Sequence, residues 1–185
     1  ENVKEGDRKE KTEKDATSKK TTIIAETKEA GAVKPLVIKG LADIKNHVGK
    51  SIGSSEWLTV TQQMINDFAA ATLNFQWVHV DVEKAKALLP GGKTIAHGYL
   101  TMSLVSQFFY QLITIQNTRS FVNYGINKAR FITPVQEGSR IRLHASITNA
   151  EEQTNGSIKL FLNGSIEIEG TDKPAYAAEI ISLLM

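Results

Sequence analysis

The chain has 185 residues, of which 41% are apolar and 23% are charged, and it contains no cysteine. This composition fits a globular domain with a real core, and the lack of cysteine excludes thiol catalysis, disulfides and cysteine-ligated zinc. A net charge of +2 gives no case for a nucleic-acid partner, and no stretch reaches the roughly 18 apolar residues of a membrane span. We therefore expect a cytoplasmic protein without a membrane span.

Residues 1 to about 35 form a charged, low-complexity stretch with few large apolar side chains. Such a segment cannot bury enough apolar surface to offset the entropy of ordering it. We expect a disordered tail, followed by one folded domain at residues 36–185. A charged helix that docks on a partner is the alternative, because opposite charges such as Glu10 and Lys14 lie four residues apart.

The first elements of the domain are predicted to be short. Residues 56–60 resemble a strand, after which Thr59 or Thr61 caps an amphipathic helix. The apolar face of this helix carries Met64, Ile65, Phe68 and Ala71. Residues 72–78 form a polar loop, and residues 82–89 form a second helix that ends at a Pro-Gly-Gly sequence.

A long helix and four strands complete the predicted fold. The residues from His97 to about Ile115 are apolar on most sides, which predicts a buried helix. Strand patterns then follow at residues 120–131, 139–150, 157–169 and 175–184, and Asn155-Gly156 gives the firmest hairpin signal. The pattern predicts an α+β fold in which an antiparallel sheet wraps around a long central apolar helix.

Two polar motifs carry the chemistry. The first places the amide of Asn74 five residues before the imidazole of His79, and the second places Gly98 at the start of the long helix. An imidazole takes a proton from water near neutral pH, and the first N–H groups of a helix stabilise negative charge. Together these groups are suited to activating water beside a carbonyl.

Three blocks in the right order resemble the MaoC-like dehydratases of the hotdog fold, which include the (R)-specific enoyl-CoA hydratases and the branch related to nodulation protein N. The blocks are Thr72–Asp81, Ile95–Thr101 and Asn123–Val135, and the resemblance covers about residues 50 to 185. It implies a homodimer with its site between the subunits. It also implies reversible addition of water to trans-2-enoyl-CoA thioesters, giving (R)-3-hydroxyacyl-CoA. Coenzyme A is then part of the substrate, and no metal or other cofactor is expected.

The resemblance also assigns roles to individual residues. His79 matches the catalytic histidine, Asn74 matches the catalytic aspartate, and Gly98 matches the residue whose N–H binds the thioester oxygen. Ser106 matches the serine that supports the catalytic carboxylate, although a hydroxyl on a helix also bonds to backbone carbonyls. His97 has no acid–base task in the family, and we expect it to be structural.

Four further residues are expected to bind substrate. Thr94 and Tyr99 are placed to line the acyl tunnel. Lys128 and Arg130 are expected to share one face of a strand and to contact the phosphates of coenzyme A, with a solvated charged face as the alternative.

Asn74 is the departure from the family pattern. Family members carry Thr-Gly-Asp where this chain carries Thr72-Leu73-Asn74. An amide can hold a water molecule, but it cannot carry a proton, and losing one acid–base group typically costs about 10²–10⁴-fold in rate. Three outcomes stay open: His79 works alone at a reduced rate, Asp81 or Asp67 substitutes, or the protein binds acyl thioesters with little turnover. Asp81 also suits the N-cap of the next helix, and a hotdog acyl-CoA thioesterase is a further rival.

Overall fold

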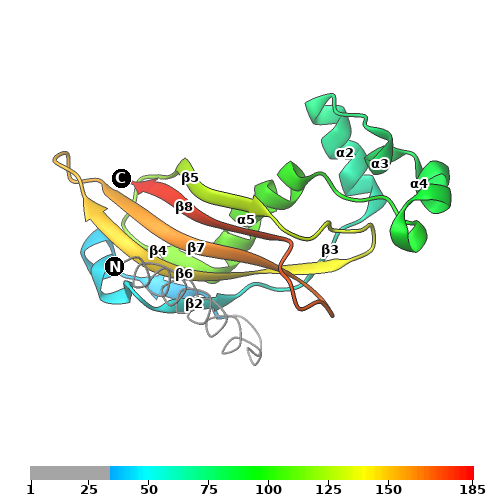
Figure 1. The fold of residues 1–185 in the computed structure, drawn as a ribbon. Coiled ribbons are helices and arrows are strands. Elements are labelled where there is room, and N and C mark those ends of the chain that lie inside the picture. The colour runs from blue at the N-terminus through cyan, green and yellow to red at the C-terminus, as the bar shows by residue number, and fades with distance from the viewer. Residues whose placement is uncertain (1–33) are drawn as a thin grey trace, which may run out of the picture. The chain divides into compact units, whose positions relative to one another are not determined.

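The computed structural model describes residues 34–185, so the predicted charged tail falls almost wholly outside the described residues. The main sheet is antiparallel, with the strand order β2-β6-β7-β8-β5, and β3 also pairs with β6 (Figure 1). The strands are β2 (Ser51–Ser54), β3 (Leu58–Thr59), β5 (Phe121–Phe131), β6 (Arg140–Glu152), β7 (Ile158–Ile168) and β8 (Tyr176–Leu184). All four long strands therefore confirm the sequence prediction.

Helix α5 (Gly98–Leu112) supplies the centre of the core. Its buried side chains include Leu100, Val105, Phe108, Phe109 and Leu112. The inward positions of β6 alternate with outward polar ones, and the buried set there is Ile141, Leu143, Ala145 and Ile147. Period-two burial on the strands facing an apolar helix is the physical basis of the predicted α+β arrangement, which the structure confirms.

The end of the long helix corrects one prediction. The helix stops at Leu112, and residues Ile113–Ile115 form strand β4, which pairs in parallel with β1 (Leu36–Ile38). The sequence Ile-Thr-Ile is β-branched throughout, which favours an extended backbone once a partner strand is available. The predicted helix to about Ile115 is therefore three residues too long.

Three helices lie together at one end of the sheet: α2 (Gln62–Thr72), α3 (Trp77–Val80) and α4 (Val82–Leu88) (Figure 1). Thr61, rather than Thr59, caps α2 by accepting a hydrogen bond from the N–H of Met64. The predicted polar loop at residues 72–78 is partly wrong, because the single turn of α3 begins inside it. The 3₁₀ segment η2 (Pro90–Gly92) follows α4, whereas the 3₁₀ segment η1 (Leu41–His47) lies between β1 and β2 in the chain.

The hairpin at Asn155-Gly156 confirms its prediction, since Gly156 has a φ of 79° in the turn between β6 and β7. Strand β5 lies at the edge of the sheet and pairs with β8 alone among the described strands. Its register shifts twice, between Asn123 and Gly125 and between Asn127 and Arg130. Each shift is a bulge that adds one residue to β5.

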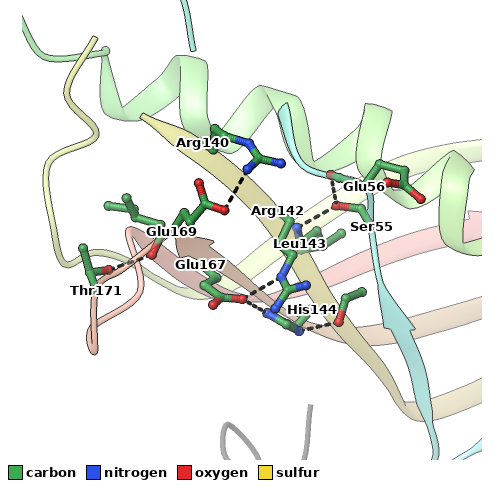
Figure 2. A network of polar contacts seen from close by, with 11 residues as sticks. Ser55, Glu56, Arg140, Arg142, Leu143, His144, Glu167, Glu169 and Thr171 are labelled. Atoms are coloured by element: carbon green, nitrogen blue, oxygen red, sulfur yellow. Dashed lines mark hydrogen bonds and ion pairs between the residues drawn. The ribbon is translucent and has the colours of Figure 1, made fainter. Parts of the chain in front are cut away.

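A polar network on the outer face of the sheet joins β2, β6 and β7 (Figure 2). One oxygen of Glu167 accepts from Arg142 Nε at 2.7 Å and lies 2.5 Å from His144 Nε2, while His144 Nδ1 lies 2.7 Å from Ser54 Oγ. The row of serine, histidine and glutamate resembles a hydrolase triad in outline only. Ser54 is 2% exposed, so substrate cannot reach its hydroxyl, and the network serves to tie the strands together.

Candidate active site

The loop after α2 begins at Leu73, which ends the helix in the left-handed conformation with a φ of 58°. Its side chain is 81% exposed. Asn74 follows, and its N–H donates to the carbonyl of Ala69 at 3.1 Å, while its side-chain oxygen accepts from the N–H of Gln76 at 3.4 Å. The loop thus presents Asn74 at the surface next to the start of α3.

His79 lies on α3 and is only 8% exposed. Its Nδ1 lies 2.7 Å from the carbonyl oxygen of Ile95. Because a carbonyl can only accept, Nδ1 carries the proton, and the neutral ring keeps its lone pair on Nε2. Burial lowers the pKa of His79; the bond to Ile95 opposes this effect, and the nearby charge of His97 adds to it. The imidazole is therefore set up as a neutral base.

His97 connects this base to the loop. It is 3% exposed and stands immediately before α5, and its Nε2 lies 3.0 Å from the backbone carbonyl oxygen of Asn74. The rings of His79 and His97 stack with their centroids 3.7 Å apart and an angle of 27° between their planes. Asn74, His79 and the first turn of α5 are thus brought together, as the two sequence motifs predict.

Gly98 opens α5 directly after His97. The first N–H groups of a helix lack intrahelical acceptors, and the helix dipole favours negative charge there. A Cβ at this position would lie 3.0 Å from the ring of Phe131. Phe131 also packs edge-on against Tyr99, with centroids 5.7 Å apart. A side chain larger than that of glycine would therefore press against the Phe131 ring where β5 approaches the helix start.

Thr94 is linked to His79 through the side chain of Gln62. It is 2% exposed, and its hydroxyl donates to the side-chain oxygen of Gln62. The amide nitrogen of Gln62 donates in turn to the carbonyl of His79 at 2.9 Å. Thr94 thus supports the histidine through Gln62, and a direct contact with substrate stays a prediction. Tyr99 is 64% exposed, which suits contact with a ligand or a second subunit.

Ser106 lies apart from Asn74 within one chain. It stands eight residues beyond Gly98, about 12 Å along the helix axis, and its hydroxyl accepts from the side chain of Asn123 at 3.3 Å. The two serve one site only if a second copy supplies one of them. A small cavity of about 20 Å³ lies beside Ser106, between α5 and the sheet.

Lys128 and Arg130 are both exposed, but their predicted shared face needs correction. The bulge between Asn127 and Arg130 adds a residue to β5, and Lys128 has a φ of 52°. The simple alternation that placed both side chains on one face does not apply across a bulge. Their contact with coenzyme A stays a prediction.

Sequence reasoning missed Gln62 and the contact between His97 and Asn74. Gln62 is an ordinary residue in the first turn of α2, and nothing in its local pattern links it to a histidine seventeen positions later. Because His97 is next to Gly98 in the second motif, the sequence predicted that it lies near the site. The sequence did not predict its bond to the backbone of a loop 23 residues earlier in the chain.

Both aspartates that could replace the family's aspartate at position 74 are hydrogen-bonded to other groups. Asp81 accepts from the N–H of Lys84 at 2.9 Å and caps α4, as expected, while Asp67 accepts from Gln63 at 2.7 Å.

Within residues 34–185, no three His, Asp or Glu side chains gather as a metal-ligand group. Among the helices of the same range, none has the length and apolar character to cross a membrane.

Comparison of the sequence with known proteins identifies its family. Residues 43–167 match the family described as MaoC like domain. The 3-hydroxyacyl-thioester dehydratase Z of Mycobacterium tuberculosis is 41% identical over 143 residues, covering 77% of this chain and 94% of the relative. Nodulation protein N of Rhizobium meliloti is 37% identical over 144 residues, covering 77% of this chain and 89% of the relative.

Solved structures agree on the fold. The monoamine oxidase regulatory protein from Archaeoglobus fulgius superposes with a TM-score of 0.65 at 25% identity, covering 82% of this chain and 97% of that one. The R-hydratase PhaJ1 from Pseudomonas aeruginosa superposes with a TM-score of 0.58 at 19% identity, covering 74% of this chain and 81% of that one. The sheet wrapped around α5 is thus the hotdog fold, and the chain belongs to the MaoC-like dehydratase family.

Proposed function

We propose that this protein is a hydro-lyase that adds water reversibly to trans-2-enoyl-CoA thioesters and gives (R)-3-hydroxyacyl-CoA. The tautomer of His79 carries the proposal: the bond from Nδ1 to Ile95 leaves the lone pair of Nε2 free beside the start of α5. A relative 41% identical is named as a 3-hydroxyacyl-thioester dehydratase, which supports the reaction class. The R configuration rests on the resemblance to R-hydratases.

In the hydration direction, His79 removes a proton from a water molecule held by the side chain of Asn74. The water oxygen bonds to the β-carbon, and the electron pair of the double bond moves toward the thioester oxygen. The N–H of Gly98 stabilises this developing enolate, an effect typically worth about 3 kcal/mol for one donor. The imidazolium of His79 then returns its proton to the α-carbon, which balances the addition of one water.

The direct test follows loss of the enoyl chromophore of crotonyl-CoA. His79→Asn keeps an N–H that can reach Ile95 but removes the base at Nε2, so we expect activity to fall at least about 10²-fold. His47→Asn is the matched control, since His47 lies on η1, outside the site. Full activity of His79→Asn would remove this residue from the mechanism. Free thiol measured in the same reactions distinguishes a thioesterase, which releases coenzyme A.

Asn74 favours a second candidate, a protein that binds acyl thioesters with little turnover. The side-chain oxygen of Asn74 already accepts from Gln76, and a carboxylate in Asn74→Asp can accept the same bond. We expect this variant to raise hydratase activity markedly, up to about the 10²–10⁴-fold that one acid–base group contributes. A fast wild type combined with no gain in the variant would contradict the view that Asn74 limits the rate.

We also propose that β5 pairs with β5 of a second copy. Its outer edge has no partner among residues 34–185, and it carries the exposed apolar side chains Val122, Tyr124 and Ile126. Open backbone groups beside apolar side chains favour pairing. Ile126→Lys should convert a dimer to a monomer in sedimentation velocity, whereas Leu88→Lys, on exposed α4, should not. A dimer that survives Ile126→Lys unchanged would contradict this interface.

A further inference from the structure

His97 contacts two residues of the first motif and directly precedes Gly98 in the second. Its Nε2 lies 3.0 Å from the carbonyl oxygen of Asn74, its ring stacks on His79 at 3.7 Å, and its backbone precedes Gly98. Phe68 of α2 packs near the same ring, with centroids 5.1 Å apart. One buried side chain therefore touches the water-holding loop and the base, and it adjoins the donor to the thioester oxygen.

The hydrogen bonds assign the protonation of both rings. The carbonyl of Asn74 can only accept, so Nε2 of His97 carries a hydrogen and donates the hydrogen bond. Its Nδ1 is buried and has no hydrogen-bond partner among residues 34–185. In the arrangement that the structure shows, His97 therefore donates from Nε2 to the loop at Asn74 and presents the face of its ring to His79.

We propose that His97 is a positioning residue of the reaction. Its imidazole holds the loop at Asn74 and fixes the ring plane of His79 by stacking against it. This inference rests on the proposed function for its kinetic part, whereas its titration part concerns only the contact between His97 and His79.

No other charged group takes over this role within the described residues. Asp67 on α2 and Asp81 before α4 bond to Gln63 and to the N–H of Lys84, respectively. Glu83 and Lys86 of α4 make no hydrogen bond or ion pair with either ring, and Lys84 lies 4.7 Å from the centroid of the Trp77 ring. His79 and His97 thus face each other without a charged side chain bonded to either ring among the described residues.

Two amide variants separate the parts of this role. In His97→Gln the amide nitrogen occupies roughly the position of Nε2 and can still donate to Asn74. In His97→Asn the shorter side chain cannot reach that carbonyl. Both variants remove the second ionisable ring, so they differ chiefly in the bond to Asn74, and each serves as the control for the other.

For crotonyl-CoA hydration we expect kcat of His97→Asn to fall by about 10–100-fold with little change in KM, since small misplacements of reacting groups cost this much. His97→Gln should retain most of kcat. In both variants the acid limb of the pH profile should move to higher pH, because the neighbouring charge and part of the burial that lower the pKa of His79 are gone. Equal losses in both variants with an unmoved acid limb would reduce His97 to a structural residue.

Titration of the His79 ring by NMR tests the same claim without turnover. We expect its pKa to rise in both variants, because part of the burial and the charge of His97 that lower it are removed. An unchanged pKa of His79 in both variants would overturn the proposal even in an active enzyme. If the wild type does not hydrate crotonyl-CoA but the pKa of His79 rises in both variants, the proposed function fails and the coupling of His97 to His79 stands.

Discussion

Leu73 is a bulky residue in a conformation that suits glycine, and this makes Leu73→Gly an informative change. Its φ of 58° is in the left-handed region, where the Cβ of an L-residue is crowded at a cost of about 1–2 kcal/mol. Glycine removes that cost, but it adds roughly 0.5–1 kcal/mol of backbone entropy to be lost on folding. Leu73 is 81% exposed, so the burial that is lost amounts to only about 0.4 kcal/mol of a leucine side chain.

The balance predicts that Leu73→Gly leaves the protein as stable as the wild type or stabilises it by about 0.5 kcal/mol. Leu88→Gly is the matched control, because Leu88 is also exposed but lies in the last turn of α4. Glycine there should cost about 1 kcal/mol. The free energies of unfolding of the two variants should therefore differ by roughly 1–1.5 kcal/mol, a difference set mainly by the backbone conformation at the two positions.

Urea unfolding followed by tryptophan fluorescence measures this difference, with equal m-values as the check that both variants unfold from comparable states. If Leu73→Gly lost as much stability as Leu88→Gly, the left-handed conformation at position 73 would be refuted. The double variant Leu73→Gly with Asn74→Asp then tests whether the family's glycine also improves the loop that holds the water.

Three other changes test separate parts of the structure. Gly98→Ala should cost about 1–3 kcal/mol by overpacking against Phe131, and thermal unfolding should show a smaller cost in a Phe131→Leu background, whereas equal costs would place the crowding elsewhere. Burial would raise the pKa of Glu167, but its bonds to Arg142 and His144 outweigh this effect and lower the pKa. The stability that this carboxylate contributes is therefore present above its pKa in the unfolded chain and is lost as the pH falls through its pKa in the folded protein. Glu167→Gln should accordingly make the free energy of unfolding less dependent on pH on the acid side. Thr61→Ala should lower the free energy of unfolding by about 1 kcal/mol through loss of the α2 cap, and chemical denaturation would show no change if the cap were dispensable.

The sequence predicted the parts of the fold that depend on local periodicity. Burial on one face of β6, β7 and β8 repeats about every two residues, and burial on α5 repeats near every 3.6 residues; these periods are visible in the chain itself. The pairing of β1 with β4 was not visible, because it joins three-residue segments about 75 positions apart. Neither segment is long enough to show a pattern, so only tertiary contact defines them as strands.

In the candidate site, too, the sequence predicted the residues within local motifs but not the contacts between distant segments. His79, Asn74 and Gly98 were found because they belong to ordered motifs, and the structure brings their elements together. The bulge near Lys128 was not predicted, because an extra residue in an edge strand leaves no signature in the alternation of polar and apolar residues. The tautomers of the two histidines depend on carbonyls supplied by distant loops, and such partners are known only after folding.

The two bulges of β5 also bear on how this edge meets other molecules. Between them, only Gly125 to Asn127 continue in unbroken register with β8. A long straight strand from an unrelated chain would find its hydrogen-bonding groups out of step at both irregularities, and bulges are one way in which proteins protect open sheet edges. The edge is thereby suited to a single shape-matched neighbour and resists open-ended growth into filaments.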